Sequence, residues 1–97
     1  MKRAQKVETE FIASIEFYDR RSLGLGSRFQ RVVERATTEI ANDPARFASD
    51  GELRQCVLQK FPFAIYFLEH EDSIGIIAVA HTSREPGYWS QRGLNQD

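Results

Sequence analysis

The sequence is poor in the residues that mark several large classes of protein. Cys56 is the only cysteine among 97 residues, which excludes an internal disulfide and with it any need for an oxidising compartment. The longest apolar stretch, residues 61–68, contains Pro62 and is far too short to span a membrane. Residues 1–6 lack the apolar core of a secretory signal. These absences predict a cytoplasmic protein with no membrane association.

An excess of charge of one sign is also missing. Thirteen Lys and Arg residues against fourteen Asp and Glu give a formal net charge of −1, so binding of nucleic acid through a global cationic field is not expected. His70 and His81 are the only histidines, and no acidic cluster has metal-ligand spacing, so we predict no metal site. Gly24 and Gly26 begin no phosphate-binding loop, because no strand precedes them, and no cofactor is expected.

The first half of the chain has the periodicity of two helices. Apolar residues recur at steps of three and four and predict a helix over residues 7–21. A second apolar stripe over residues 29–40 predicts another helix, with Ser27 as its N-cap and its end just before Pro44. The two glycines between the helices favour a tight turn and hence an antiparallel hairpin.

In the second half the period changes to two. A loop is predicted over residues 44–52, followed by strands over 53–60, 63–69 and 73–81. Regular alternation predicts two opposite faces for the last strand: Ile74, Ile76, Ala78 and Ala80 on one, and Ile77, Val79 and His81 on the other. The sequence thus predicts a single α+β domain over residues 1–97, an N-terminal helical hairpin packed on a small antiparallel sheet of about three strands. The sheet face away from the hairpin is expected to need a partner.

Two groupings of residues near the C-terminus each have a chemical and a structural interpretation. His81 ends the last predicted strand and Arg84 follows three residues later, a pair suited to acid–base work and to phosphate or carboxylate binding. The alternative for His81 is a partly buried side chain that is hydrogen-bonded to the C-terminal segment. Arg84 and Arg92 flank Trp89, which suits stacking on a base or contact with a carboxylate-rich partner, or else an arginine packed on an aromatic ring.

Two further features have a structural and a functional interpretation. Arg28, Arg31 and Arg35 share one face of the second predicted helix, which is either a solvated surface or a docking site for an acidic partner. Cys56 alternates with Arg54 in a predicted strand and is interpreted as a small core residue, because no His or Asp lies at a spacing that would make it a nucleophile.

Several segments, taken in order, resemble one family. They are Phe17-Tyr18-Asp19, Gly24-Leu25-Gly26, Arg28-Phe29, Ile40, Asn42-Asp43-Pro44, Phe61-Pro62-Phe63-Ala64-Ile65-Tyr66 and His81-Thr82-Ser83-Arg84-Glu85-Pro86-Gly87-Tyr88-Trp89. Together, over residues 6–92, they resemble the RelE/ParE superfamily of toxins from bacterial type II toxin–antitoxin modules, also called plasmid stabilisation proteins. The resemblance implies a helical hairpin on a small antiparallel sheet. It also implies a cognate antitoxin that holds the toxin inactive in a hetero-oligomer.

The sequence departs from the family pattern at two places. Only residues 1–5 precede the first predicted helix, so the first strand of the family is expected to be short or missing. Ala64 follows Phe63 where RelE-like ribonucleases often carry an arginine. ParE-like members inhibit DNA gyrase by binding, whereas RelE-like members cut mRNA on the ribosome. The near-neutral charge and Ala64 favour the binding type.

The resemblance also assigns residues to roles. If the protein is a ribonuclease, His81 is the general acid or base and Arg84 stabilises the phosphate, together with Arg54 and Arg92. The residues expected to bind a target or partner are Arg54, Lys60, Tyr88, Trp89 and Arg92. A third alternative is a degenerate member that is not toxic and only binds an antitoxin-like partner.

Overall fold

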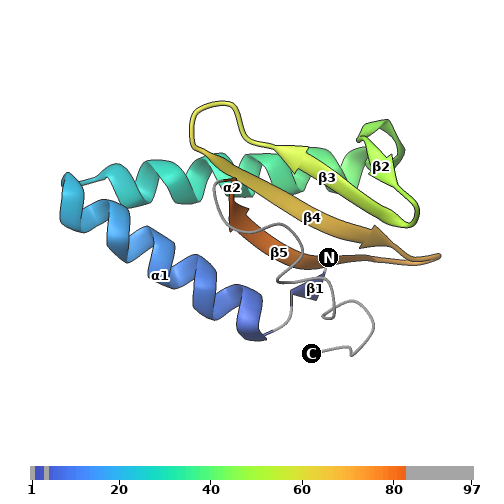
Figure 1. Cartoon of the computed structure of the whole chain (residues 1–97), viewed down its shortest axis with the longest axis horizontal. Helices are drawn as coiled ribbons and strands as arrows, with labels where there is room; N and C mark the ends of the chain where they lie inside the picture. Colours follow the sequence, from blue (N-terminus) through green and yellow to red (C-terminus); the bar gives the residue numbers. More distant parts are fainter. Residues whose placement is uncertain (1, 4, 83–97) are drawn as a thin grey trace.

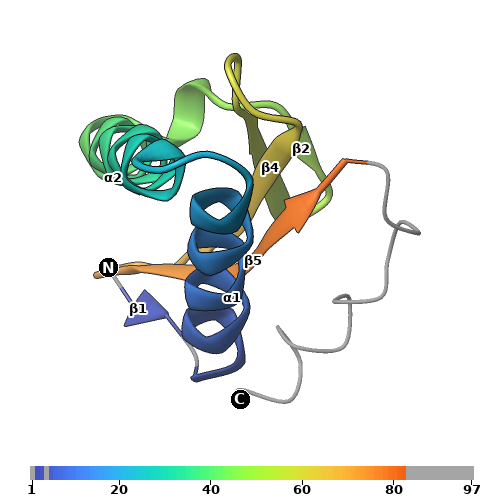
Figure 2. The same cartoon turned by 90° about the vertical axis from the view of Figure 1, so that its left-hand side faces the viewer.

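The computed structural model describes residues 2–3 and 5–82. Its elements in chain order are β1 (Lys2–Arg3), α1 (Gln5–Arg21), α2 (Leu25–Asn42), the 3₁₀ helix η1 (Pro44–Arg46), β2 (Ser49–Asp50), β3 (Leu53–Val57), β4 (Phe63–Glu69) and β5 (Ile74–His81). The two helices form a hairpin (Figure 1) and pack on one face of a single sheet (Figure 2). The predicted α+β class and the helical hairpin on a sheet are therefore confirmed.

The sheet has more strands than the sequence predicts. Its order is β1-β5-β4-β3-β2; β2 to β5 are antiparallel neighbours, and β1 joins β5 in parallel. The prediction of about three strands is wrong because β1 and β2 have only two residues each, too few to show an alternation in sequence. The predicted loop over residues 44–52 likewise contains η1 and β2. Strand β1 shows that a short strand does precede α1.

Glycine sets the start of the second helix. Gly24 has φ of 86°, a left-handed conformation that costs little for a residue without Cβ, and it is the N-cap residue of α2. The prediction of Ser27 as N-cap is wrong, since α2 begins at Leu25 and Ser27 lies in its first turn. The predicted apolar stripes are confirmed, because they supply the buried residues of both helices: Val7, Phe11, Phe29, Val33 and Ile40 among them.

The core lies between the hairpin and the sheet and is rich in aromatic rings. Phe29 of α2 is fully buried at its centre. Its ring centroid lies 4.8 Å from that of Phe63, and 5.2 Å from those of Tyr18 and Phe61. Such tilted and edge-on pairs stabilise a core beyond the burial of their area. This cluster fixes α1, α2 and the start of β4 relative to one another.

A β-bulge in β5 exchanges the faces of that strand. Tyr66 and Phe67 of β4 pair with Ala78 and Ile76, so Ile77 is the extra residue. Ile74, Ile76 and Val79 consequently all lie in the core under the helices, and Ile77, Ala78 and Ala80 pack on the opposite face. The predicted regular alternation is wrong from this point on. On the opposite face these three side chains are already buried, which leaves Leu53, Tyr66 and Leu68 half-buried around them.

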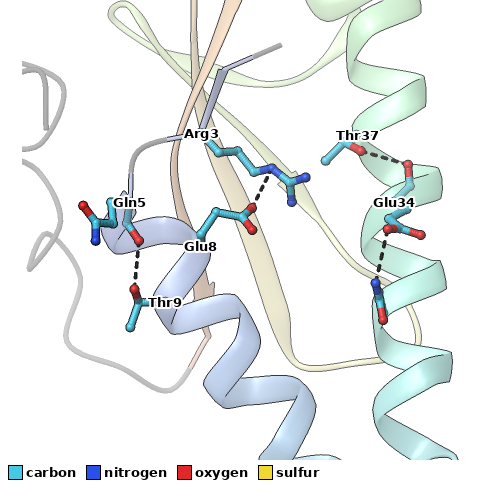
Figure 3. Close-up of polar contacts among 7 residues, drawn as sticks. Arg3, Gln5, Glu8, Thr9, Glu34 and Thr37 are labelled. Atoms are coloured by element: carbon cyan, nitrogen blue, oxygen red, sulfur yellow. Dashed lines mark hydrogen bonds and ion pairs between the residues drawn. The ribbon is translucent and has the colours of Figure 1, made fainter.

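Strand β1 is tied to α1 by charge. Arg3 Nε lies 3.0 Å from Glu8 Oε1 (Figure 3), and the Arg3 guanidinium lies 5.7 Å from the centre of the Phe11 ring. The Arg3–Glu8 pair therefore helps to hold a strand that is too short to be stable by backbone pairing alone.

Hydroxyl groups on the helices bond back to their own backbone: Thr9 donates to the Gln5 carbonyl oxygen, and Thr37 to that of Glu34 (Figure 3).

Candidate functional site

His81 lies at the end of β5, on the face that carries α1. It is the register partner of Phe63, with ring centroids 5.1 Å apart and planes at 73°. The half-buried imidazole lines a hollow of about 240 Å³ together with Glu10, Ser14 and Tyr18 of α1. An imidazole and a carboxylate that line one hollow are groups able to exchange a proton with a ligand. The bulge at residue 77 is what turns His81 toward the helices.

The guanidinium of Arg54 binds groups of its own chain. Its Nη1 donates to the carbonyl oxygens of Phe47 at 2.8 Å and of Ala45 at 3.2 Å, and its Nε lies 3.6 Å from Glu69 Oε1. These contacts join β3 to the η1–β2 segment and to the end of β4. A guanidinium with three such partners holds the backbone together and has few donors left for a phosphate.

The strand register separates Arg54 from His81. Arg54 pairs with Phe67, and His81 pairs with Phe63, so their positions are four residues apart along β4. At about 3.3 Å per residue the separation along the sheet is roughly 13 Å. The face between them is occupied by Ile65 and Phe67, both fully buried under the helices. The two side chains therefore do not meet at one phosphodiester group.

Lys60 lies in the β3–β4 connection, next to the arginine-bearing face of α2. The structure brings them together around one hollow of about 160 Å³, which we name the cationic groove. It is lined by Arg28, Arg31, Val32, Arg35, Lys60 and Phe61. All four cations are exposed, and Val32 and Phe61 are half-buried at its floor. Four positive charges around an apolar floor can hold an anionic ligand that also presents apolar groups.

Cys56 is buried, as predicted, and is packed in the core cluster. Burial raises the pKa of its thiol, and the nearby Glu39 carboxylate adds to the increase while Arg46 opposes it. A thiol with a raised pKa holds little thiolate at neutral pH and is a poor nucleophile. The geometry therefore gives Cys56 a packing role.

The remaining predicted site residues, Arg84, Tyr88, Trp89 and Arg92, lie outside the described residues. Among those described, no group of three or more His, Cys, Asp or Glu side chains could hold a metal ion. Neither α1 nor α2 in this part of the chain combines the length and hydrophobicity that a membrane-crossing helix needs.

The sequence indicates the four cations of the cationic groove but not that they lie together. The spacing of Arg28, Arg31 and Arg35 shows that they share a helix face, and Lys60 is a predicted binding residue on its own. No sequence signal places residue 60 beside α2, because that proximity is set by how the hairpin is docked on the sheet. Phe61 is a further lining residue that was not predicted to belong to a site.

Comparison with known proteins adds no assignment. No protein-family model matches the sequence, and no curated protein is detectably similar to it.

Proposed function

We propose that this protein is the toxin of a bacterial type II toxin–antitoxin module, with a fold of the RelE/ParE type. It acts in the cytoplasm, is neutralised by a cognate antitoxin in a hetero-oligomer, and arrests growth by binding its target, DNA gyrase, rather than by cutting mRNA. Two things support the toxin class: the ordered segments between residues 17 and 89 that resemble this superfamily, and a helical hairpin packed on a largely antiparallel sheet.

The observation that favours binding over cleavage is the separation of Arg54 from His81. Cleavage of RNA needs a general acid or base and a cation that stabilises the phosphate at the same group of atoms. Arg54 and His81 register with Phe67 and Phe63, which are four residues apart along β4, and Arg54 is held by two backbone carbonyls and Glu69. Inhibition by binding requires no such convergence, and Ala64 in place of an arginine agrees with it.

The test is inducible expression in a bacterium that lacks the antitoxin, with growth followed for the wild type, His81→Ala and the matched control His70→Ala. His70 is the only other histidine and is exposed, in the β4–β5 turn. Purified protein is assayed in parallel for inhibition of gyrase supercoiling and for cuts in translated mRNA. We expect growth arrest with all three proteins, loss of supercoiling activity and intact mRNA.

Two results would each contradict a defined part of the proposal. Cuts in mRNA that His81→Ala abolishes and His70→Ala does not would establish the ribonuclease alternative. Growth without arrest, from a folded wild-type protein, would leave only the non-toxic partner-binding alternative. A neighbouring reading frame for a short protein with a DNA-binding N-terminus and a disordered C-terminus would support the module itself.

A further inference from the structure

The cationic groove is a concentration of uncompensated positive charge in a protein whose net charge is −1. Arg28, Arg31 and Arg35 are spaced by three and four residues on α2, so the outer two lie about 10 Å apart along the helix axis. Lys60 closes the opposite side. Four like charges around one hollow repel one another, and an anionic ligand relieves that repulsion.

None of these four cations has an acidic partner in the part of the chain that the structure describes. The ion pairs there are Arg3–Glu8, Arg46–Glu39 and Arg54–Glu69, and no carboxylate lines the groove. Arg3, Arg46 and Arg54 thus have acidic partners within the chain. The guanidinium and ammonium groups of the cationic groove remain available to a ligand.

The groove continues into a second, larger hollow of about 390 Å³ that shares Val32, Arg35 and Lys60 with it. The second hollow runs between α2 and residues 56–60, and its lining includes Ala36, Cys56 and Leu58. Strand β2 pairs with β3 at Leu53 and Arg54, and the Gln55 N–H donates to the Ala48 carbonyl oxygen, so the last residues of β3, 56 and 57, form the edge of the sheet next to this hollow. An extended chain can follow a sheet edge while its side chains enter the hollows.

We propose that the cationic groove and the adjoining hollow bind an extended acidic segment of a partner protein. Its carboxylates pair with Arg28, Arg31, Arg35 and Lys60, and its intervening apolar side chains pack on Val32 and Phe61. The proposal concerns binding at this surface and does not depend on inhibition of gyrase.

The chemistry of the groove favours an acidic polypeptide over a nucleic acid. Base stacking needs an accessible aromatic face. Among the described residues, Phe61 is the aromatic residue that lines the groove; it is half-buried, and its ring centroid lies 5.1 Å from that of Tyr18 and 5.2 Å from that of Phe29. A segment that alternates acidic and apolar side chains satisfies both the cationic rim and the apolar floor.

The test measures fluorescence anisotropy of labelled probes with the purified full chain. The probes are a short peptide of alternating Glu and Leu, the same peptide with Gln in place of Glu, and a single-stranded oligouridylate. The groove variant Arg31→Glu/Lys60→Glu reverses two exposed charges. The new carboxylate at position 31 lies four residues before Arg35, a spacing that stabilises helix α2. The matched control Lys6→Glu/Arg20→Glu replaces two exposed cations of α1, so it changes the net charge by the same amount as the groove variant. Circular dichroism verifies that both variants are folded.

We expect the Glu–Leu peptide to bind, and the groove variant to bind it at least about tenfold more weakly. The control variant is expected to stay within about twofold, and the Gln–Leu peptide and about 0.5 M salt both weaken binding. Absence of Glu–Leu peptide binding, or equal loss in both variants, would overturn the proposal. Tighter binding of the oligouridylate than of the peptide, lost in the groove variant, would assign the surface to nucleic acid instead. None of these measurements depends on growth arrest, so this inference and the proposed function fail separately.

Discussion

The backbone N–H of Gly26 donates a 2.8 Å hydrogen bond to Oδ1 of Asp19, which joins the first turn of α2 to the last turns of α1. The contact is possible because Gly26 has no side chain. A Cβ atom at this position would collide with the carbonyl oxygen of Ile15 and would lie 2.7 Å from the Asp19 carboxylate. The helical hairpin is therefore closed by a direct backbone approach that only glycine permits.

Gly26→Ala is expected to lower the free energy of unfolding by about 1–3 kcal/mol, because the Ile15 carbonyl belongs to a helix backbone and cannot move aside cheaply. Chemical denaturation measures the change. The neighbouring Ser27→Ala is the control, with an expected change within about 0.5 kcal/mol, since Ser27 is exposed and caps nothing. Equal stability of Gly26→Ala and the wild type would contradict the close approach of the helices.

Phe29→Ala is expected to destabilise the protein by about 3–5 kcal/mol, because it leaves a cavity between Tyr18, Phe61 and Phe63 in the centre of the core. Phe17→Ala is the matched control on α1, where the ring is 45% exposed, and it should cost much less. Thermal and urea unfolding of the two variants give the comparison. Similar losses in both would show that the aromatic cluster does not form the core.

Arg54→Ala is expected to lower the free energy of unfolding by about 1–3 kcal/mol, because the carbonyl oxygens of Phe47 and Ala45 lose a charged donor. The control is Arg46→Ala, which removes an ion pair to Glu39 in which both side chains are about half exposed, and should cost less than about 1 kcal/mol. If denaturation gives Arg54→Ala the same free energy of unfolding as the wild type, Arg54 has no structural role and is again a candidate ligand for phosphate.

Stability is expected to fall at alkaline pH. Burial raises the pKa of Tyr18 above its ordinary value of 10.0 and that of Cys56 above 9.0; Arg21 opposes the first increase, and Glu39 adds to the second. The unfolded chain therefore releases these protons at lower pH than the folded chain does. Their contribution is fully present below about pH 9 and is lost as the pH rises through the raised pKa values.

Urea unfolding at a series of pH values from about 7 to 11 measures this loss. The double variant Tyr18→Phe/Cys56→Ala, compared with its own stability at neutral pH, should show a shallower alkaline decline than the wild type. The same slope in both proteins would mean that neither group is buried as the structure places it.

The helices and the main strands could be predicted because each has its own local pattern. The stripes that include Val7 and Phe29 have a helical period and do bury their residues, and the alternation around Ile65 does define strand β4. The exchange of faces in β5 could not be predicted. Ile77 is apolar like its neighbours, so nothing in the sequence distinguishes a bulged residue from a paired one.

The candidate sites divide in the same way. The residue types were visible in the sequence: a histidine at a strand end, three arginines on one helix face and a lysine before Phe61. Their partners were not. Arg54 is predicted to bind a target, yet it donates to the carbonyl oxygens of Phe47 and Ala45. Every residue has a backbone carbonyl, so the residue types in the sequence do not indicate such partners.

The sequence by itself determined the α+β class, the helical hairpin and the apolar surfaces, because the periods of 3.6 and 2 are properties of the local chain. Only the tertiary structure decided which charges lie together. The docking of α2 on the sheet brings Lys60 to Arg31 and Arg35, while the ladder of β3, β4 and β5 keeps Arg54 away from His81. Such distances depend on register and packing between segments far apart in the chain, which no local pattern encodes.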